Sequence, residues 1–183
     1  MGAWHQDLVV KGVPEEEVDT VVKKILDYLQ LTKIVSTKPT DGSLGQGTQY
    51  GPGVNWKSAV EISDEDHFLD LSSNSLEIQT GRTVFYADGR EFDSIACPNC
   101  GENNLECDWS TLFSQWIQDP TTADWQCKNC GTSNAISEYQ FEPKWALGNL
   151  GFTFWNWPRL NDAFIERLEV LVGKKIEKVE GKI

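Results

Sequence analysis

The chain has 183 residues, 39% of them hydrophobic and 11% aromatic, and a formal net charge of −12. This length and composition suit one domain with its own core, and the negative charge argues against a nucleic-acid-binding protein and favours a basic protein partner. No apolar run approaches the roughly 20 residues of a membrane span and no signal peptide opens the chain, which predicts a cytoplasmic protein with no membrane partner.

The N-terminal segment predicts a strand followed by a helix. Residues 8–10 form a short apolar run, and Pro14 suits the first position of a helix. The three glutamates at 15–17 favour the positive end of the helix dipole. From residue 18 to residue 29, apolar side chains recur at helical spacing, so one face of this helix packs on a core. We expect a strand or extended segment after it.

The middle of the chain is rich in turn-forming residues and short apolar runs. Residues 40–54 contain five glycines and one proline, which predicts a long exposed loop. No Gly-Lys-Ser/Thr sequence follows these glycines, so they do not indicate a nucleotide site. Beyond the loop, short apolar runs predict an antiparallel sheet, with a turn at Asp88-Gly89. The predicted strands are 56–62, 68–71, 75–79, 83–86 and 90–95.

The C-terminal segment repeats the plan of the N-terminal one. Residues 152–157 predict a strand, Pro158 follows it, and Asn161 can cap a helix that ends at Gly173. Residues 174–183 predict a last strand. The fold class is therefore α+β, with a mainly antiparallel sheet and two β-Pro-α-β units, which is typical of a ferredoxin-like duplication.

Two short cysteine elbows, each Cys-x-x-Cys-Gly, are the most specific motif. They contain Cys97 and Cys100, and Cys127 and Cys130. In each elbow the glycine supplies the positive φ needed to leave the turn. Four thiolates complete the tetrahedral shell of a structural zinc ion and leave no position open for a substrate. The cysteines therefore predict one structural zinc ion, with thiol–disulfide chemistry as an alternative.

The paired elbows, 26 residues apart, resemble the zinc ribbon family over about residues 93–140. The resemblance implies two knuckles that cap β-hairpins and hold one zinc ion between them. We expect residues 93–140 to form an inserted ribbon module, and residues 1–92 and 141–183 to form together one α+β domain. Residues 109–124 exceed what a ribbon needs and predict a short helix or packed loop.

Two alternatives follow from known proteins with such elbows. Many zinc ribbons serve transcription or RNA machinery, but residues 93–140 contain one lysine and seven acidic residues, which argues against nucleic-acid binding. Rubredoxins also use paired Cys-x-x-Cys-Gly knuckles, so iron is the rival metal and a redox module the second alternative.

No catalytic constellation is identifiable, and the sequence does not predict an enzyme. Cys107, the fifth cysteine, is expected to be a small, partly buried hydrophobic residue. A cysteine nucleophile needs a neighbouring base, and the chain offers only His5 and His67. The sequence places neither histidine beside Cys107.

Two groups of residues are candidates for binding a partner. The first is the acidic cluster of Asp64, Glu65, Asp66 and Asp70, which forms either a solvated turn or a contact patch for a basic protein. The second is Trp155 with Trp157, which on a strand would face one side. If the phenylalanines between and before them face the core, both indoles face outward and become interface candidates.

These observations predict a non-enzymatic protein-interaction domain that contains structural zinc and binds a basic protein. Bacterial immunity proteins and antitoxins resemble this profile, because they are small, acidic, metal-containing and without catalytic motifs. An acidic inhibitor of this kind gains association rate from electrostatic steering toward a basic partner. The sequence does not indicate an oligomeric state.

Overall fold

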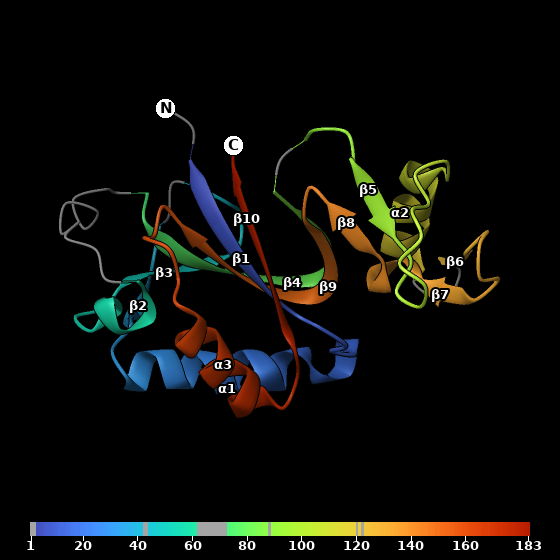
Figure 1. Cartoon of the computed structure of the whole chain (residues 1–183). Coiled ribbons are helices and arrows are strands. Elements are labelled where there is room, and N and C mark those ends of the chain that lie inside the picture. The colour runs from blue at the N-terminus through green and yellow to red at the C-terminus, as the bar shows by residue number, and fades with distance from the viewer. Residues whose placement is uncertain (1–2, 42–43, 62–72, 88, 120, 122) are drawn as a thin grey trace.

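The computed structural model describes residues 3–41, 44–61, 73–87, 89–119, 121 and 123–183. A six-stranded antiparallel sheet runs through the molecule in the order β10-β1-β9-β4-β3-β2, which confirms the predicted α+β class (Figure 1). Its strands are β1 (Trp4–Val10), β2 (Val35–Thr40), β3 (Thr48–Pro52), β4 (Ser75–Tyr86), β9 (Trp145–Trp155) and β10 (Ile176–Lys182).

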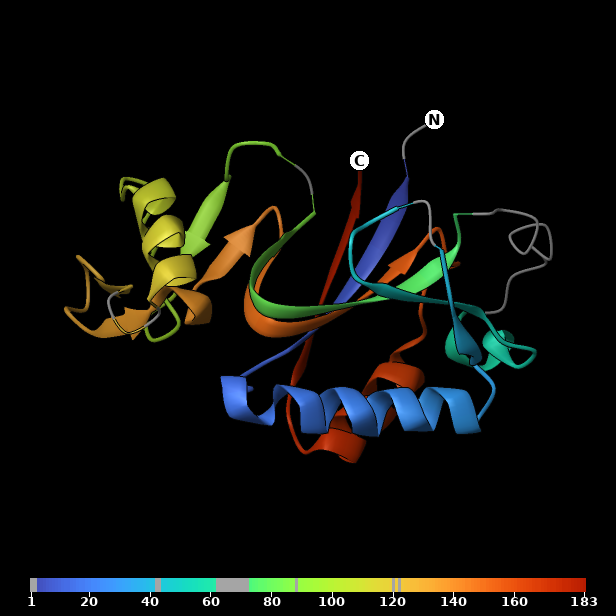
Figure 2. The same cartoon turned by 180° about the vertical axis from the view of Figure 1, so that it is seen from behind.

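Two helices, α1 (Val18–Leu31) and α3 (Asp162–Val172), lie on the same face of this sheet (Figures 1 and 2). Helix α3 joins β9 to β10, and β1 lies between these two strands. Helix α1 joins β1 to β2, and β9, β4 and β3 lie between these two strands. Only the C-terminal crossover is therefore a split β-α-β unit with one strand in between. The two predicted β-Pro-α-β units are present, whereas their origin by duplication stays a prediction.

The helix ends follow the local sequence signals. A 3-10 turn at Glu15–Glu17 leads into α1. At the start of α3, Oδ1 of Asn161 accepts a hydrogen bond of 2.7 Å from the backbone N–H of Phe164. Gly173 ends α3 in the left-handed conformation, with φ of 67°. A capping asparagine and a C-terminal glycine satisfy backbone groups that the helix leaves unpaired.

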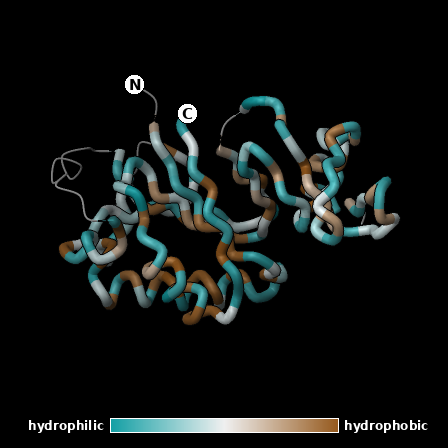
Figure 3. Tube along the Cα trace, viewed as in Figure 1, coloured by the Kyte–Doolittle hydropathy of each residue, from teal (hydrophilic) through white to brown (hydrophobic). Residues whose placement is uncertain are grey.

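The main core lies between these helices and the sheet. Apolar residues recur every three to four positions along both helices, so each helix buries one face (Figure 3). The fully buried members of this core include Leu8, Ile25, Leu29, Leu76, Phe152, Phe154, Trp157 and Leu168. Because side chains alternate along a strand, the neighbours of these strand residues project from the opposite, helix-free face.

The prediction of a long exposed loop at residues 40–54 is wrong, because β2 ends and β3 forms within it. Strand β3 pairs with β2 on one side and with β4 on the other, and Tyr50 is buried. A Cβ at Gly47 would lie 2.5 Å from the carbonyl oxygen of Ile78. At Gly47 the absence of a side chain therefore permits close approach of strands, and the glycine-rich composition does not indicate a loop.

Other predicted strands also differ from the structure. Residues 56–59 form a 3-10 helix that buries Trp56 and Ala59, so the strand predicted at 56–62 is wrong. The two strands predicted at 75–79 and 83–86 are one, β4, with a register shift between Thr80 and Thr83. Of the strand predicted at 90–95, only its last two residues belong to β5 (Ser94–Ala96). The strand predicted at 68–71 and Asp88 of the predicted turn lie outside the described residues.

The cysteine region packs around a second core at one end of the sheet (Figures 1 and 2). Its elements are β5, α2 (Trp109–Gln118), β6 (Asp124–Gln126), β7 (Ser133–Ala135), a 3-10 turn (Ile136–Glu138) and β8 (Gln140–Glu142). Of the short helix or packed loop predicted for residues 109–124, the structure has the helix, α2. Leu147 of β9 is a buried member of this core, so the core is not built from residues 93–140 alone. The predicted division into domain and inserted module stays a prediction.

Candidate metal centre

The sulfur atoms of Cys97, Cys100, Cys127 and Cys130 all lie within 4.8 Å of one another. The Sγ atoms of Cys97 and Cys130 are 3.8 Å apart, and those of Cys100 and Cys127 are 3.7 Å apart. A tetrahedral zinc ion with Zn–S bonds of about 2.3 Å requires neighbouring sulfurs about 3.8 Å apart. The four sulfurs therefore fit one metal ion, as the elbows predict.

The two knuckles have the same backbone geometry. The N–H groups of Gly101 and Gly131 each donate a 2.9 Å hydrogen bond to the carbonyl of the first cysteine in their own elbow. Both glycines are left-handed, with φ of 73° and 72°. A Cβ at either position would meet no atom within 4 Å, so backbone conformation and not space requires glycine.

The knuckles are carried by different frameworks. Strands β6 and β7 form a hairpin around the second knuckle, as the resemblance to zinc ribbons implies. The first knuckle follows β5, whose partner is β8 from far along the chain. Only a single bridge, from Ala96 to Asn103, joins the two sides of the first knuckle. The β-hairpin that the resemblance implies for the first knuckle is therefore not formed, and β5 pairs with β8 instead.

Two asparagines support the sulfurs from outside the cluster. The side-chain amide of Asn104, which is buried, donates to Sγ of Cys127 at 3.7 Å and to the carbonyl of Glu102 at 2.8 Å. The amide of Asn129, which is exposed, donates to Sγ of Cys100 at 3.6 Å. Donors aimed at ligand sulfurs favour the thiolate and fix the ligand's orientation.

The surroundings of the four thiols differ. The backbone N–H of Cys130 is the main cause that lowers the pKa of Cys127 to about 6. Hydrogen bonds from Thr132 lower the pKa of Cys130. Burial raises the pKa of Cys97 to about 11, which disfavours its ionised form. A bound metal cation supplies the positive charge that four thiolates need.

Cys107 stands apart from the metal cluster. It is half-buried and packs against the second core, as expected of a small hydrophobic residue. Burial, with the nearby charge of Asp108, raises the pKa of the Cys107 thiol to about 11. A thiol in this state is a poor nucleophile near neutral pH. His67, one of the two histidines, lies outside the described residues.

Of the two predicted partner-binding groups, only the tryptophans lie within the described residues. Asp64, Glu65, Asp66 and Asp70 lie outside the described residues, so their role stays a prediction. The exposed position predicted for Trp155 and Trp157 is wrong, because both are buried. The strand ends at Trp155, and Asn156 takes a positive φ of 54°. This turn places Trp157 in the main core, edge-on to Phe154, and breaks the alternation that would have put both indoles on one face.

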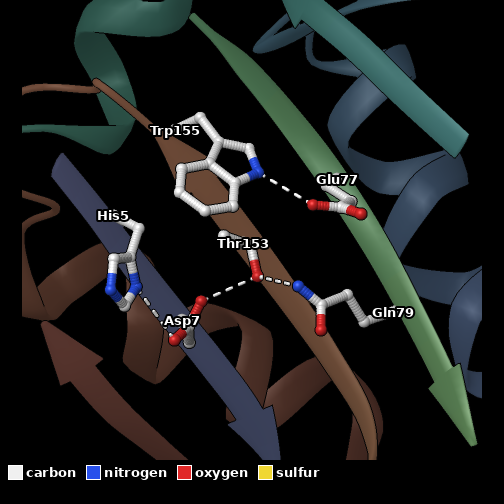
Figure 4. Close-up of polar contacts among 6 residues, drawn as sticks. All are labelled: His5, Asp7, Glu77, Gln79, Thr153 and Trp155. Carbon is white, nitrogen blue, oxygen red and sulfur yellow. Dashed lines mark hydrogen bonds and ion pairs between the residues drawn. The ribbon is translucent and has the colours of Figure 1, made fainter. Parts of the chain in front are cut away.

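A second polar cluster, which the sequence analysis missed, lies on the helix-free face of the sheet (Figure 4). It joins His5 and Asp7 of β1, Glu77 and Gln79 of β4, and Thr153 and Trp155 of β9. All except Gln79 are less than 9% exposed. The sequence signal for this cluster is weak, because it consists only of polar residues at alternate positions in three strands that are far apart in the chain.

The four cysteines are the one group of three or more metal-ligating side chains found among the described residues. None of the described helices is both long and apolar enough to cross a membrane. Comparisons with protein-family models, with curated proteins and with solved structures found no significant match to this chain. The resemblance to zinc ribbons therefore rests on the two knuckles.

Proposed function

We propose that this protein is a non-enzymatic interaction domain that contains one structural zinc ion and binds a basic protein. The observation that carries the zinc site is the set of four sulfurs within 4.8 Å. Four thiolates fill a tetrahedral shell, so such a site stabilises the surrounding chain and offers no place for a substrate. The knuckle glycines and the asparagine donors support the same role.

The metal content and the stability of one variant test the structural role. We expect one zinc ion per purified chain by elemental analysis, and a large fall in melting temperature for Cys97→Ser. Cys107→Ser is the matched control, because Cys107 is half-buried but outside the cluster. An unchanged melting temperature for Cys97→Ser, or an equal fall for Cys107→Ser, would contradict the proposal.

An iron-binding redox module is a second candidate, favoured by the exposure of Cys100 and Cys130. Two ligand residues at the surface allow electron transfer to an external partner, and iron accepts the same four sulfurs. An iron form would be red as purified and would bleach on reduction. A colourless protein that contains only zinc contradicts this candidate.

The basic partner is inferred from charge. The chain carries −12, and residues 93–140 contain one lysine against seven acidic residues. Such a surface attracts cationic proteins over long range and repels phosphate backbones. We therefore infer that this protein acts in the cytoplasm and resembles an immunity protein or antitoxin in size and charge.

Affinity capture at two salt concentrations tests the class of partner. From cells of its source, the tagged protein is expected to retain proteins of high isoelectric point at low salt and to lose them at high salt. Nuclease treatment should leave this retention unchanged. Capture of RNA or DNA, or retention that nuclease abolishes, would support the nucleic-acid alternative instead.

A further inference from the structure

The polar cluster on the helix-free face borders two cavities. One, of about 270 Å³, is lined by His5, Asp7, Gln79 and Trp155 among others. The other, of about 460 Å³, is lined by Glu77, Gln79 and Trp155. Gln79, Thr83 and Trp155 line both, so the two cavities are adjacent, and we call them together the sheet-face groove.

The sheet-face groove contains two buried carboxylates, and its lining contains no lysine or arginine. Asp7 is 4% exposed and Glu77 is 2% exposed. Within the described part of the chain, neither forms an ion pair with lysine or arginine, and the groove lining contains neither residue type. Asp7 contacts the His5 ring, and Glu77 accepts from the backbone N–H groups of Gln46 and Gly47 at 2.8 and 2.6 Å, so both are partnered without a lysine or arginine.

Asp7 determines the direction of the hydrogen bonds around it (Figure 4). An ionised carboxylate only accepts, so the hydroxyl of Thr153 must donate its single proton to Oδ1 of Asp7, at 2.7 Å. Oγ1 of Thr153 can then only accept from Nε2 of Gln79, at 3.0 Å. This places the amide oxygen of Gln79 away from Thr153, and that oxygen has no protein partner among the described residues.

The same reasoning applies to His5. Its Nδ1 lies 3.1 Å from Oδ2 of Asp7 and therefore carries the proton of that hydrogen bond. The other ring nitrogen, Nε2, has no hydrogen-bond partner in the described chain, and it lies beside Gly181, where a Cβ would come within 2.6 Å of it. His5 is 5% exposed and lines the groove. The unused amide oxygen of Gln79 is thus the hydrogen-bond acceptor that this cluster leaves free among the described residues.

The groove also offers aromatic surface. The indole of Trp155 lines both cavities, and its N–H donates to Oε2 of Glu77 at 2.8 Å, which fixes the ring. Tyr86, which is partly exposed, lines the smaller cavity. An aromatic face attracts organic cations, most strongly where water is displaced.

We propose that the sheet-face groove binds a guanidinium group. A guanidinium is a planar cation with five donors and no acceptor, which complements the unused oxygen of Gln79, the two carboxylates without a lysine or arginine partner, and the indole face. The group could belong to a free small molecule or to an arginine side chain of a protein, and both share this chemistry. The inference goes beyond the proposed function, because it depends on neither the zinc ion nor a protein partner.

Titration with two matched amides tests the groove. Argininamide and norleucinamide share the backbone amine, but only argininamide has a guanidinium. By NMR we expect argininamide to saturate the signals of the His5 ring and the Trp155 indole N–H at one molecule per chain. Norleucinamide should leave them unmoved. Equal shifts from both compounds, or none from argininamide, would overturn the proposal.

Variants locate the binding and separate it from overall charge. Asp7→Asn should weaken argininamide binding about tenfold or more, because a charge-assisted contact is lost. Glu166→Gln makes the same charge change on exposed helix α3, across the sheet, and should leave affinity within about twofold. If Asp7→Asn does not fold, Gln79→Met removes one acceptor from a less buried position and should also weaken binding. Equal effects from Asp7→Asn and Glu166→Gln would contradict the site.

The source of the guanidinium is resolved by a peptide. A neutral-ended Gly/Ser peptide with a single central arginine is compared with argininamide. Tighter binding of the peptide supports a protein side chain, and tighter binding of argininamide supports a small molecule. Either result can hold if zinc is absent or if no basic protein is captured, so failure of the proposed function is distinguishable from failure of this inference.

Discussion

Gly101 and Gly131 hold equivalent positions at the ends of the two knuckles, with nearly identical left-handed φ angles. No other atom approaches the space that a Cβ would occupy at either residue. The backbone conformation, and not a lack of space, therefore requires glycine at these positions. An added side chain would strain the backbone without a steric clash.

Replacing either knuckle glycine by alanine should lower the free energy of unfolding by about 1 kcal/mol, the cost of a left-handed L-residue. Gly89→Ala is the matched control, because Gly89 also has open space around it but no left-handed φ. Denaturant unfolding with metal bound measures all three variants. A loss for Gly89→Ala as large as for Gly101→Ala would show that the knuckle conformation is not the cause.

Asn104 is the buried donor to the metal cluster, and its amide reaches both a sulfur and a backbone carbonyl. We expect Asn104→Ala to lower metal affinity about 10- to 100-fold, as removal of supporting partners commonly does. The exposed donor Asn129 should matter less, so Asn129→Ala is the comparison. Competition with a chromophoric chelator gives both affinities, and a larger loss for Asn129→Ala would be the opposite of this expectation.

At the scale of elements, α2 is capped by Asp108, the residue that precedes it. Oδ1 of Asp108 accepts from the backbone N–H of Thr111 at 3.1 Å, and Oδ2 accepts from its hydroxyl at 2.7 Å. The hydroxyl and then the N–H of Thr111 lower the pKa of Asp108 from its usual 3.8. The ionised carboxylate also favours the positive end of the helix.

A carboxyl group with a lowered folded-state pKa stabilises the protein above its unfolded pKa, and this stabilisation is lost as pH falls through the folded value. Wild type should therefore melt above Asp108→Asn at about pH 6, and the difference should narrow as pH falls below about 4. Asparagine still caps a helix, so this variant removes the charge. Thermal melts across this range measure the difference, and a gap that does not narrow as pH falls below about 4 would rule out the charge of Asp108 as its cause.

At the scale of the whole molecule, two large hydrophobic cores are stabilised differently. The main core is covered by α1 and α3 and contains no cysteine of the metal cluster. The second core includes Cys97 and Cys127 together with Trp109 and Trp116. Metal binding is thus connected directly to the packing of the second core only.

Removal of metal by a chelator should therefore unfold the second core first. We expect loss of the near-ultraviolet circular dichroism of the tryptophans around α2, while backbone amides of β1 keep their protection from hydrogen exchange. Returning zinc should restore the lost signal. Simultaneous loss of protection in β1 would instead show that the metal stabilises the entire sheet.

The parts of the fold that the sequence predicted depend on nearby residues. Cys97 and Cys100 belong to one tight turn, and Asn161 caps α3 through a residue three positions away, so short-range patterns suffice. Trp157 was misplaced because the left-handed turn at Asn156 depends on distant contacts. Asn156 exchanges two hydrogen bonds with the backbone of Trp4, more than 150 residues away in sequence.

The sequence by itself determined the two cysteine knuckles, the helices after Pro14 and Asn161 and the α+β class, because each follows from residues close together in the chain. Only the tertiary structure decided the pairing of β3, the pairing of β5 with β8, and the meeting of Asp7 with Thr153 and Glu77 with Trp155. These features come from strands separated by tens of residues, whose register is chosen by burial of the whole sheet. Local sequence patterns therefore do not specify the register of these strands.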